Sequence, residues 1–139
     1  MNYLAIDLGD KRTGIAVGDN ELKLVHPITV LQIPIGDLLF DAILELIEEH
    51  DADELVLGLP INMDGSIGQR AKLTKTFGDT LKERTSLQVH YQDERLTSAA
   101  AEERLHQSGK TRQQKKNIRD ALAAAEFLTD FLQANQSSS

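Results

Sequence analysis

The sequence predicts an α/β fold, in which a five-stranded mixed sheet carries helices on both faces. The first observation is the apolar run at residues 54–60, which is continuous and therefore typical of a strand covered on both sides. The second is that this run stands between two segments of helical spacing, which make the strands they connect parallel. The third is the start of the chain, where two β-like runs around a glycine-containing turn predict an antiparallel pair.

Hydrophobic periodicity and turn residues give the bounds of the other elements. The predicted strands are residues 3–6, 13–17, 25–33, 54–60 and 87–91. The predicted helices are residues 37–50, 69–84, 97–107 and 112–133. The third strand is expected near an edge, because Pro27 cannot donate a backbone hydrogen bond to a neighbour.

Helical spacing also predicts which side chains face the core. In the first helix, which Asp37 can cap, they are Leu38, Leu39, Ala42, Ile43, Leu46 and Ile47. In the second helix they are Ala71, Leu73, Phe77 and Leu81. The small residues at 121–125 would let the last helix lie close against the sheet. We expect one domain over residues 1–134 and a flexible tail at residues 135–139.

Composition favours an ordinary globular protein. The chain has 139 residues, of which 40% are hydrophobic, and this is enough for one domain with its own core. The absence of cysteine excludes disulfides, thiol nucleophiles and thiolate metal sites. No apolar run is long enough to span a bilayer, and the N-terminus enters a strand directly. We therefore expect a cytoplasmic protein without a membrane partner.

The charge is unevenly distributed along the chain. The formal net charge is −7, but the segment 104–119 holds six basic residues and no acid, so the remainder carries −13. A basic strip on an acidic body can bind phosphates locally, although a solvated helix face would look the same.

Acidic residues follow three of the predicted strands. Ligands of open α/β sheets bind at the carboxyl ends of parallel strands, so the first, fourth and fifth strands would bring their ends to one edge. The last helix can bring one more acid over that edge. The candidates are Asp7, Asp64, Asp93, Glu94 and Asp120.

Clustered carboxylates repel one another unless cations lie between them, and hard oxygen ligands select Mg²⁺ or Mn²⁺. Two such ions about 3.5–4 Å apart can activate a water and stabilise the leaving oxygen of a phosphodiester. Structural interpretations stay open: Asp64 can form a turn, Asp93 and Glu94 can favour the start of a helix, and Asp120 can pair with Lys116.

Four segments, taken together, resemble the YqgF/RuvX-type family. They are DLGDKRTGIAV at residues 7–17, GLPINMDG at 58–65, DERLT at 93–97, and Asp120 followed by an alanine-rich helix. The resemblance covers nearly the whole chain, in order. Members are described as Holliday-junction resolvases and as nucleases that mature the 5′ end of pre-16S ribosomal RNA.

The resemblance implies a ribonuclease H-like fold and a divalent-metal nuclease with Mg²⁺ or Mn²⁺ as cofactor. It makes Asp7, Glu94 and Asp120 the catalytic residues and metal ligands, with Asp93 as the alternative to Glu94; Asp10 is not counted as a ligand. The basic residues that we expect to bind nucleic acid are Lys11, Arg12, Arg95, Lys110, Arg112, Lys115, Lys116 and Arg119.

We therefore expect an endonuclease that acts on structured nucleic acid, with 5′-end processing of pre-16S ribosomal RNA as its leading function. One alternative is a Holliday-junction resolvase, which would need a two-fold dimer for two symmetric cuts. Another is a non-catalytic RNA-binding factor in ribosome assembly. A nucleotide-binding protein of the actin or hexokinase type is disfavoured, because one small domain cannot form a two-lobed cleft. The sequence leaves open RNA or DNA as substrate, and a monomer or homodimer.

Overall fold

The computed structural model describes residues 1–61, 64–93 and 112–134, and of residues 112–118 it describes the backbone alone. The strands are β1 (Asn2–Asp7), β2 (Thr13–Asp19), β3 (Leu24–Leu31), β4 (Glu54–Leu59) and β5 (Gln88–Asp93). The helices are α1 (Asp37–Glu49), α2 (Gln69–Thr85) and α4 (Arg112–Ala134). Each lies within a few residues of the range that periodicity predicts.

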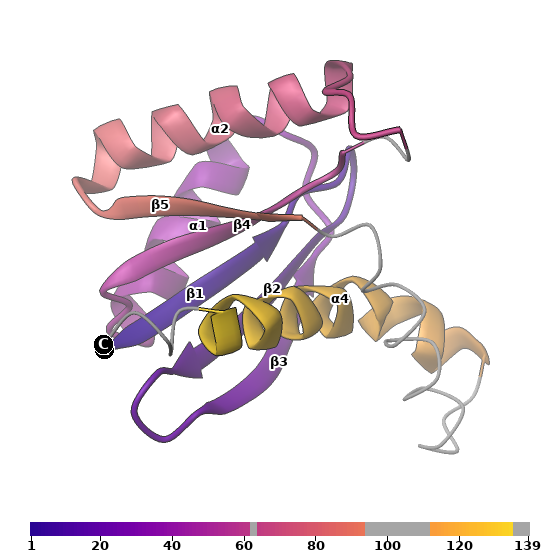
Figure 1. Ribbon diagram of the computed structural model, residues 1–139. Helices are drawn as coiled ribbons and strands as arrows, with labels where there is room; N and C mark the ends of the chain where they lie inside the picture. Colours follow the sequence, from indigo (N-terminus) through magenta and orange to yellow (C-terminus); the bar gives the residue numbers. More distant parts are fainter. Residues whose placement is uncertain (62–63, 94–111, 135–139) are drawn as a thin grey trace.

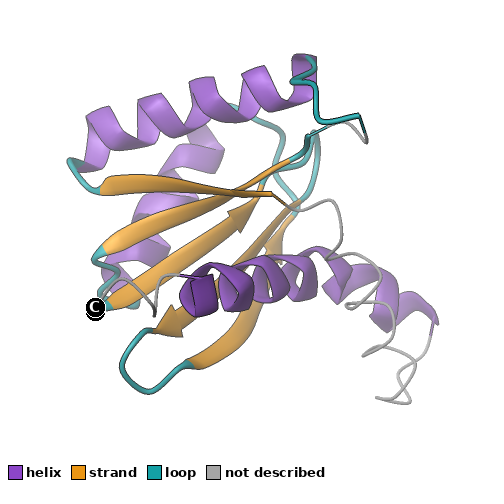
Figure 2. Cartoon of the chain, viewed as in Figure 1, coloured by secondary structure: helices purple, strands orange, loops and turns teal. Residues whose placement is uncertain are grey.

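The strands form one sheet in the order β3-β2-β1-β4-β5 (Figures 1 and 2). The pairs β1–β2 and β2–β3 are antiparallel, whereas β1–β4 and β4–β5 are parallel. The predicted five-stranded mixed sheet is therefore confirmed, and β3 with its Pro27 is an edge strand as expected. The carboxyl ends of β1, β4 and β5 lie at the same edge.

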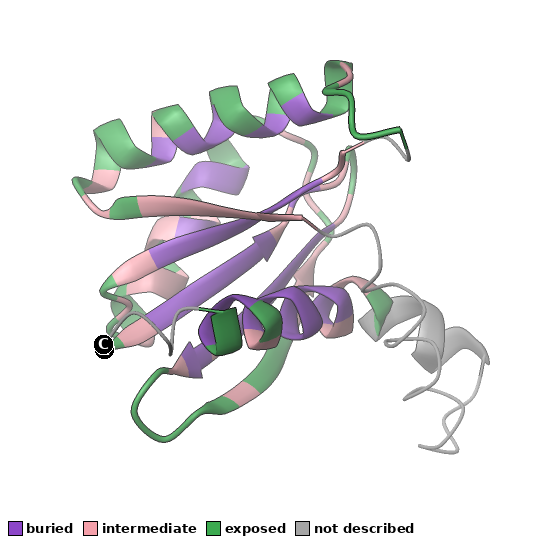
Figure 3. Cartoon of the chain, in the orientation of Figure 1, coloured by how far each residue is buried: buried purple, intermediate pink, exposed green. Residues whose placement is uncertain are grey.

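Helices cover both faces of this sheet, with α1 and α2 on one side and α4 on the other (Figure 1). Alternation along β1 separates two cores, because Leu4 and Ile6 pack toward α1 and α2 while Tyr3 and Ala5 pack toward α4. Figure 3 shows the result: β1, β4 and the sheet-facing side of α4 are buried. Within the described ranges, none of the helices combines the length and hydrophobicity needed to cross a bilayer.

Small residues on β2 set how closely α4 approaches the sheet. Ala16 is fully buried in the core under α4. A Cβ added at Gly18 would lie 2.9 Å from Leu128 Cδ2. Alanines of α4 pack against this strand, since Ala124 and Ala125 belong to the same buried cluster as Ala16. The helix can therefore rest almost directly on the backbone of β2.

Three local predictions are wrong. Leu38 is 73% exposed and Leu73 is 39% exposed, so neither belongs to the core. On α2 the buried position next to Ala71 is Thr74, whose hydroxyl donates to the Arg70 carbonyl one turn back. The N-cap of α1 is Gly36, and Asp37 lies in the first turn instead. The helix expected at residues 97–107 and the tail at 135–139 lie outside the described residues.

Candidate active site

Asp7 ends β1 at the edge where the parallel strands finish. It pairs directly with Gly14 on antiparallel β2, and residues opposite each other in such a pair share a face of the sheet. Alternation agrees, because Tyr3 and Ala5, four and two residues earlier, both pack toward α4. The half-buried Asp7 side chain therefore stands on the α4 side of the sheet.

Asp120 reaches the same corner through the backbone of Gly14. A Cβ added at Gly14 would overlap the Asp120 carbonyl and lie 2.6 Å from the Ala121 amide nitrogen. Only glycine permits this approach. Since Gly14 is flanked by Asp7 within the sheet and by Asp120 above it, two acids that are far apart in sequence converge here.

A cation stands beside this pair of acids. Arg12 Nε lies 3.6 Å from Asp120 Oδ2, and the Nε atom is buried. The two side chains are 28% and 34% exposed, so the ion pair is partly shielded from water. The alternative partner for Asp120, Lys116, belongs to the part of α4 whose side chains are not described.

The loop between β1 and β2 has a fixed shape. A Cβ at Gly9 would overlap the Arg12 carbonyl, so the loop closes tightly on itself. From the first turn of α2, Arg70 donates through Nη1 to Asp10 Oδ1 at 2.5 Å and through Nη2 to the Leu8 carbonyl at 3.1 Å. Asp10 is thus an anchor of the loop, consistent with its exclusion from the ligands.

Arg70 is a residue that sequence reasoning missed. A cation in the first turn of a helix faces the positive end of the helix dipole and is unfavourable without a partner. The position of Arg70 in that first turn could therefore have indicated that it has an acidic or carbonyl partner. Its partners are Asp10 and the Leu8 carbonyl, in the same loop as Arg12.

Asp93 lies on the opposite side of the sheet from Asp7. Two residues earlier on β5, the Tyr91 hydroxyl donates to the Lys75 carbonyl of α2 and packs against Gly78, so this face of β5 looks toward α2. Alternation places Asp93 on that face too. Glu94 lies outside the described residues.

The Tyr91 phenol is partly buried in this contact with α2. Its burial and the nearby Asp79 raise the pKa of the Tyr91 phenol.

Asp64 forms a local turn with Ser66. Its Oδ1 accepts hydrogen bonds from the Ser66 amide at 2.9 Å and the Ser66 hydroxyl at 2.6 Å. These bonds lower the pKa of the Asp64 carboxyl. Gly65 has φ of +87°, a conformation that glycine adopts without strain.

The predicted basic residues are only partly placed. Lys11 and Arg119 are exposed, and Arg12 pairs with Asp120 as described. Arg112, Lys115 and Lys116 belong to the first turns of α4, which project past the sheet (Figure 1). Arg95 and Lys110 lie outside the described residues.

The donor set suits a hard divalent cation. Asp7 and Asp120 supply carboxylate oxygens, and the chain contains no cysteine that would favour a softer metal. A guanidinium already compensates Asp120, which shows that this corner accommodates positive charge. Within the described ranges, no three Asp, Glu, His or Cys residues come together, and the predicted third ligand, Glu94, falls outside them.

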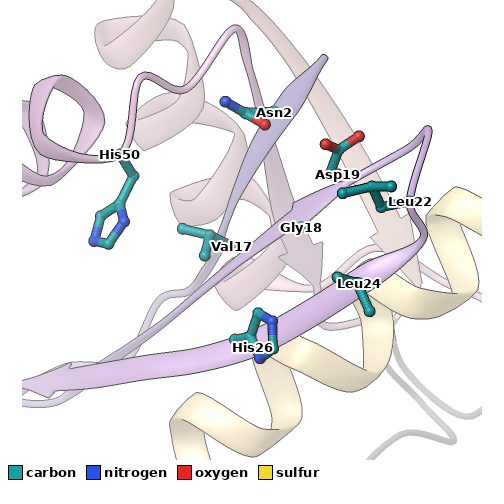
Figure 4. A pocket seen from close by; sticks show the side chains of 8 residues that line it. All are labelled: Asn2, Val17, Gly18, Asp19, Leu22, Leu24, His26 and His50. Carbon is teal, nitrogen blue, oxygen red and sulfur yellow. The ribbon is translucent and has the colours of Figure 1, made fainter.

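A separate groove of about 230 Å³ lies at the other end of β1 (Figure 4). Asn2, Val17, Asp19 and Leu24 line it together with two histidines, His26 and His50. Because Asn2 begins β1 and Asp7 ends it, the strand length separates this groove from the acids.

Comparison with known proteins identifies the family. A curated relative from Dechloromonas aromatica, named "Putative pre-16S rRNA nuclease", is 37% identical over 131 residues, covering 94% of this chain and 90% of that protein. A relative of the same name from Lactococcus lactis is 39% identical and covers 95% and 94% of the two chains.

Solved structures share the fold at low sequence identity. RuvC from Thermus thermophilus, in complex with a Holliday junction, matches with a TM-score of 0.62 at 16% identity, covering 100% of this chain and 98% of that one. The Fowlpox virus resolvase with Holliday junction DNA gives 0.64 at 12% identity, covering 98% and 99%. The ribonuclease H-like fold expected from the sequence is therefore confirmed. The family model described as "RuvX: Holliday junction resolvase" matches residues 1–134, and the chain belongs to that family.

Proposed function

We propose that this chain is a divalent-metal-dependent endonuclease that hydrolyses phosphodiester bonds in structured nucleic acid, with 5′-end processing of pre-16S ribosomal RNA as its main reaction. The observation that carries the proposal is the convergence of Asp7 and Asp120 at the carboxyl edge of the sheet, with Gly14 between them. Membership of the RuvX family and the names of the curated relatives support it.

Asp7, Glu94 and Asp120 would hold the metal, for which we propose Mg²⁺ or Mn²⁺. The orientation of Asp93 favours Glu94 over Asp93, because Asp93 shares a face with Tyr91 and points away from the side on which Asp7 stands. When bound, the cation would activate a water and stabilise the charge on the leaving oxygen. Basic residues on the projecting turns of α4 would bind the nucleic-acid backbone, together with Lys11 and Arg119.

The test is cleavage of a pre-16S ribosomal RNA fragment by purified protein with Mg²⁺ or Mn²⁺. Asp7→Asn and Asp120→Asn are expected to abolish cleavage while retaining RNA binding, because each removes a metal ligand without removing a basic residue. Asp64→Asn makes the same chemical change in a turn outside the site and should cleave normally. Normal cleavage by Asp7→Asn would refute the catalytic role of Asp7. A wild-type protein that binds the RNA but does not cleave it with either metal would favour a non-catalytic assembly factor.

A Holliday-junction resolvase is the second candidate, because the description of the matching family names that activity. Two symmetric cuts require two active sites and hence a two-fold dimer on the junction. Measuring the molecular mass of the protein in solution, with and without a four-way DNA junction, distinguishes a dimeric resolvase from a monomeric RNA nuclease. A monomer that binds the junction without cutting it, yet trims the RNA, would exclude the resolvase.

A further inference from the structure

We propose that Arg12 is a built-in counter-ion for Asp120, which holds that carboxylate in the metal-free protein and must give it up when a divalent cation binds. This rests on the proposed metal site. It concerns a residue that the sequence suggested only as a contact to nucleic acid. The structure instead directs Arg12 at an acid of the site, with Nε 3.6 Å from Oδ2.

Asp7 pairs with Gly14 and the backbone of Asp120 rests on Gly14, so the two acids approach the same corner. Neighbouring carboxylates repel each other unless positive charge lies near them. Asp120 cannot move away from the strand pair, because its backbone rests on Gly14. A cation is therefore needed at this corner whether or not a metal is bound, and Arg12 supplies one.

The same geometry makes the two cations compete. A magnesium ion held by the Asp120 carboxylate would stand close to the Arg12 guanidinium, because Arg12 Nε lies 3.6 Å from Oδ2 of that carboxylate. Two cations at that separation repel, and the ion pair with Asp120 is weakened as the metal takes up the same oxygens. Metal binding and the Arg12–Asp120 pair thus oppose each other.

The position of Arg12 would allow its guanidinium to bind substrate once it has left Asp120. The loop that carries it is held from α2 by Arg70 and shaped by Gly9, so the Arg12 backbone stays in place when its side chain leaves Asp120. The side chain is already 28% exposed and can turn to solvent. A released guanidinium next to the metal would meet a phosphate of the substrate, so metal loading would prepare the protein for nucleic acid.

The test measures Mn²⁺ affinity directly, by calorimetry or by the electron paramagnetic resonance of free Mn²⁺, without any cleavage assay. Arg12→Met removes the competing charge, and we expect its Kd for Mn²⁺ to fall about two- to fivefold, the range for a partly exposed ion pair. Arg12→Lys keeps the charge and should stay nearer to the wild type. Lys11→Met removes the same charge from the preceding residue and should change the Kd less than Arg12→Met.

Thermal unfolding gives a second readout. In EDTA, Arg12→Met should melt below the wild type, because Asp120 has lost the charge of Arg12. Saturating Mn²⁺ should raise the Tm of this variant by more than that of the wild type. A Tm deficit that persists in Mn²⁺ would mean that Arg12 is only a packing residue.

Two failures are distinguishable. If Asp7→Asn and Asp120→Asn bind Mn²⁺ as tightly as the wild type, the proposed metal site itself is wrong. If both lose Mn²⁺ while Arg12→Met binds it equally or more weakly than the wild type, the metal site stands and the counter-ion role of Arg12 is overturned.

Discussion

At the scale of single residues, Gly14 decides whether the two acids can meet. A glycine inside a strand is usually a weakness, since it adds backbone entropy to the unfolded chain and packs no side chain. Here it lies between Asp7 within the sheet and the backbone of Asp120 above it. Glycine at this position lowers the intrinsic stability of β2, but a larger residue would prevent α4 from packing this close to the strand.

Gly14→Ser is therefore expected to destabilise the protein by about 1–3 kcal/mol, the range for forcing atoms into a packed interior. Serine has a higher strand propensity than glycine, so propensity alone predicts the opposite sign. Urea unfolding measures the difference. Gly36→Ser is the control, because no atom lies within 4 Å of the added Cβ and serine is a good N-cap. Equal stabilities for the two variants would contradict the close approach.

At the scale of elements, α2 supports the site from the far face of the sheet. Its first turn reaches the β1–β2 loop through Arg70, which bridges Asp10 and the Leu8 carbonyl. Its last turn carries Arg84, which pairs with Asp37 and lies 4.6 Å above the centre of the Phe40 ring. One end of the helix thus fixes a functional loop, and the other fixes α1.

Removing Arg70 should loosen the loop more than it lowers overall stability. The Asp10 side chain is 76% exposed, so we expect Arg70→Gln to cost no more than about 1 kcal/mol in unfolding free energy. Hydrogen exchange at residues 8–12 should become faster, because the loop loses its anchor. Arg84→Gln changes an arginine of the same helix and should leave exchange in that loop unchanged. Equal exchange in both variants would show that Arg70 does not hold the loop.

How far the sequence predicts this structure also depends on the element. Strands and helices with strong periodicity were predicted within a few residues, and strand order predicted the end of β1, with Asp7, at the same edge as the ends of β4 and β5. Leu38 and Leu73 were misassigned because helical spacing does not fix which side of a broad apolar stripe is covered. The Arg70 contacts were missed because they join residues far apart in the sequence, 60 positions for the Asp10 carboxylate and 62 for the Leu8 carbonyl.

At the scale of the whole molecule, charge is distributed unevenly among the helices. The exposed side of α1 carries Asp37, Asp41, Glu45, Glu48 and Glu49, and the helix has no basic residue. The basic residues of α4 lie on the other side (Figure 1). A polyanion would be repelled by α1 and attracted to the basic first turns of α4. The helix α2, on the same face as α1, also carries exposed lysines and therefore provides a control for position.

The double variant Lys115→Ala/Lys116→Ala should weaken RNA binding and flatten its dependence on salt. Two fewer phosphate contacts would reduce the slope of log K against log salt concentration by about 1.4–1.8. Lys72→Ala/Lys75→Ala is the matched control, since it removes two exposed charges from α2 on the far face. Filter binding between 50 and 200 mM salt, roughly the range in which such contacts are lost, measures both. An identical loss of slope in the two variants would mean that net charge matters and position does not.

Backbone atoms have no alternative rotamers, so the contact between Gly14 and Asp120 is either made or lost as a unit. A sub-global opening that lifts α4 from β2 would carry Asp120 away from Asp7 in one step. Heat or denaturant would then change how many molecules are competent at a given moment, while each competent molecule would keep the same architecture. The rate of catalysis would therefore be proportional to the fraction of molecules in which α4 is packed on β2.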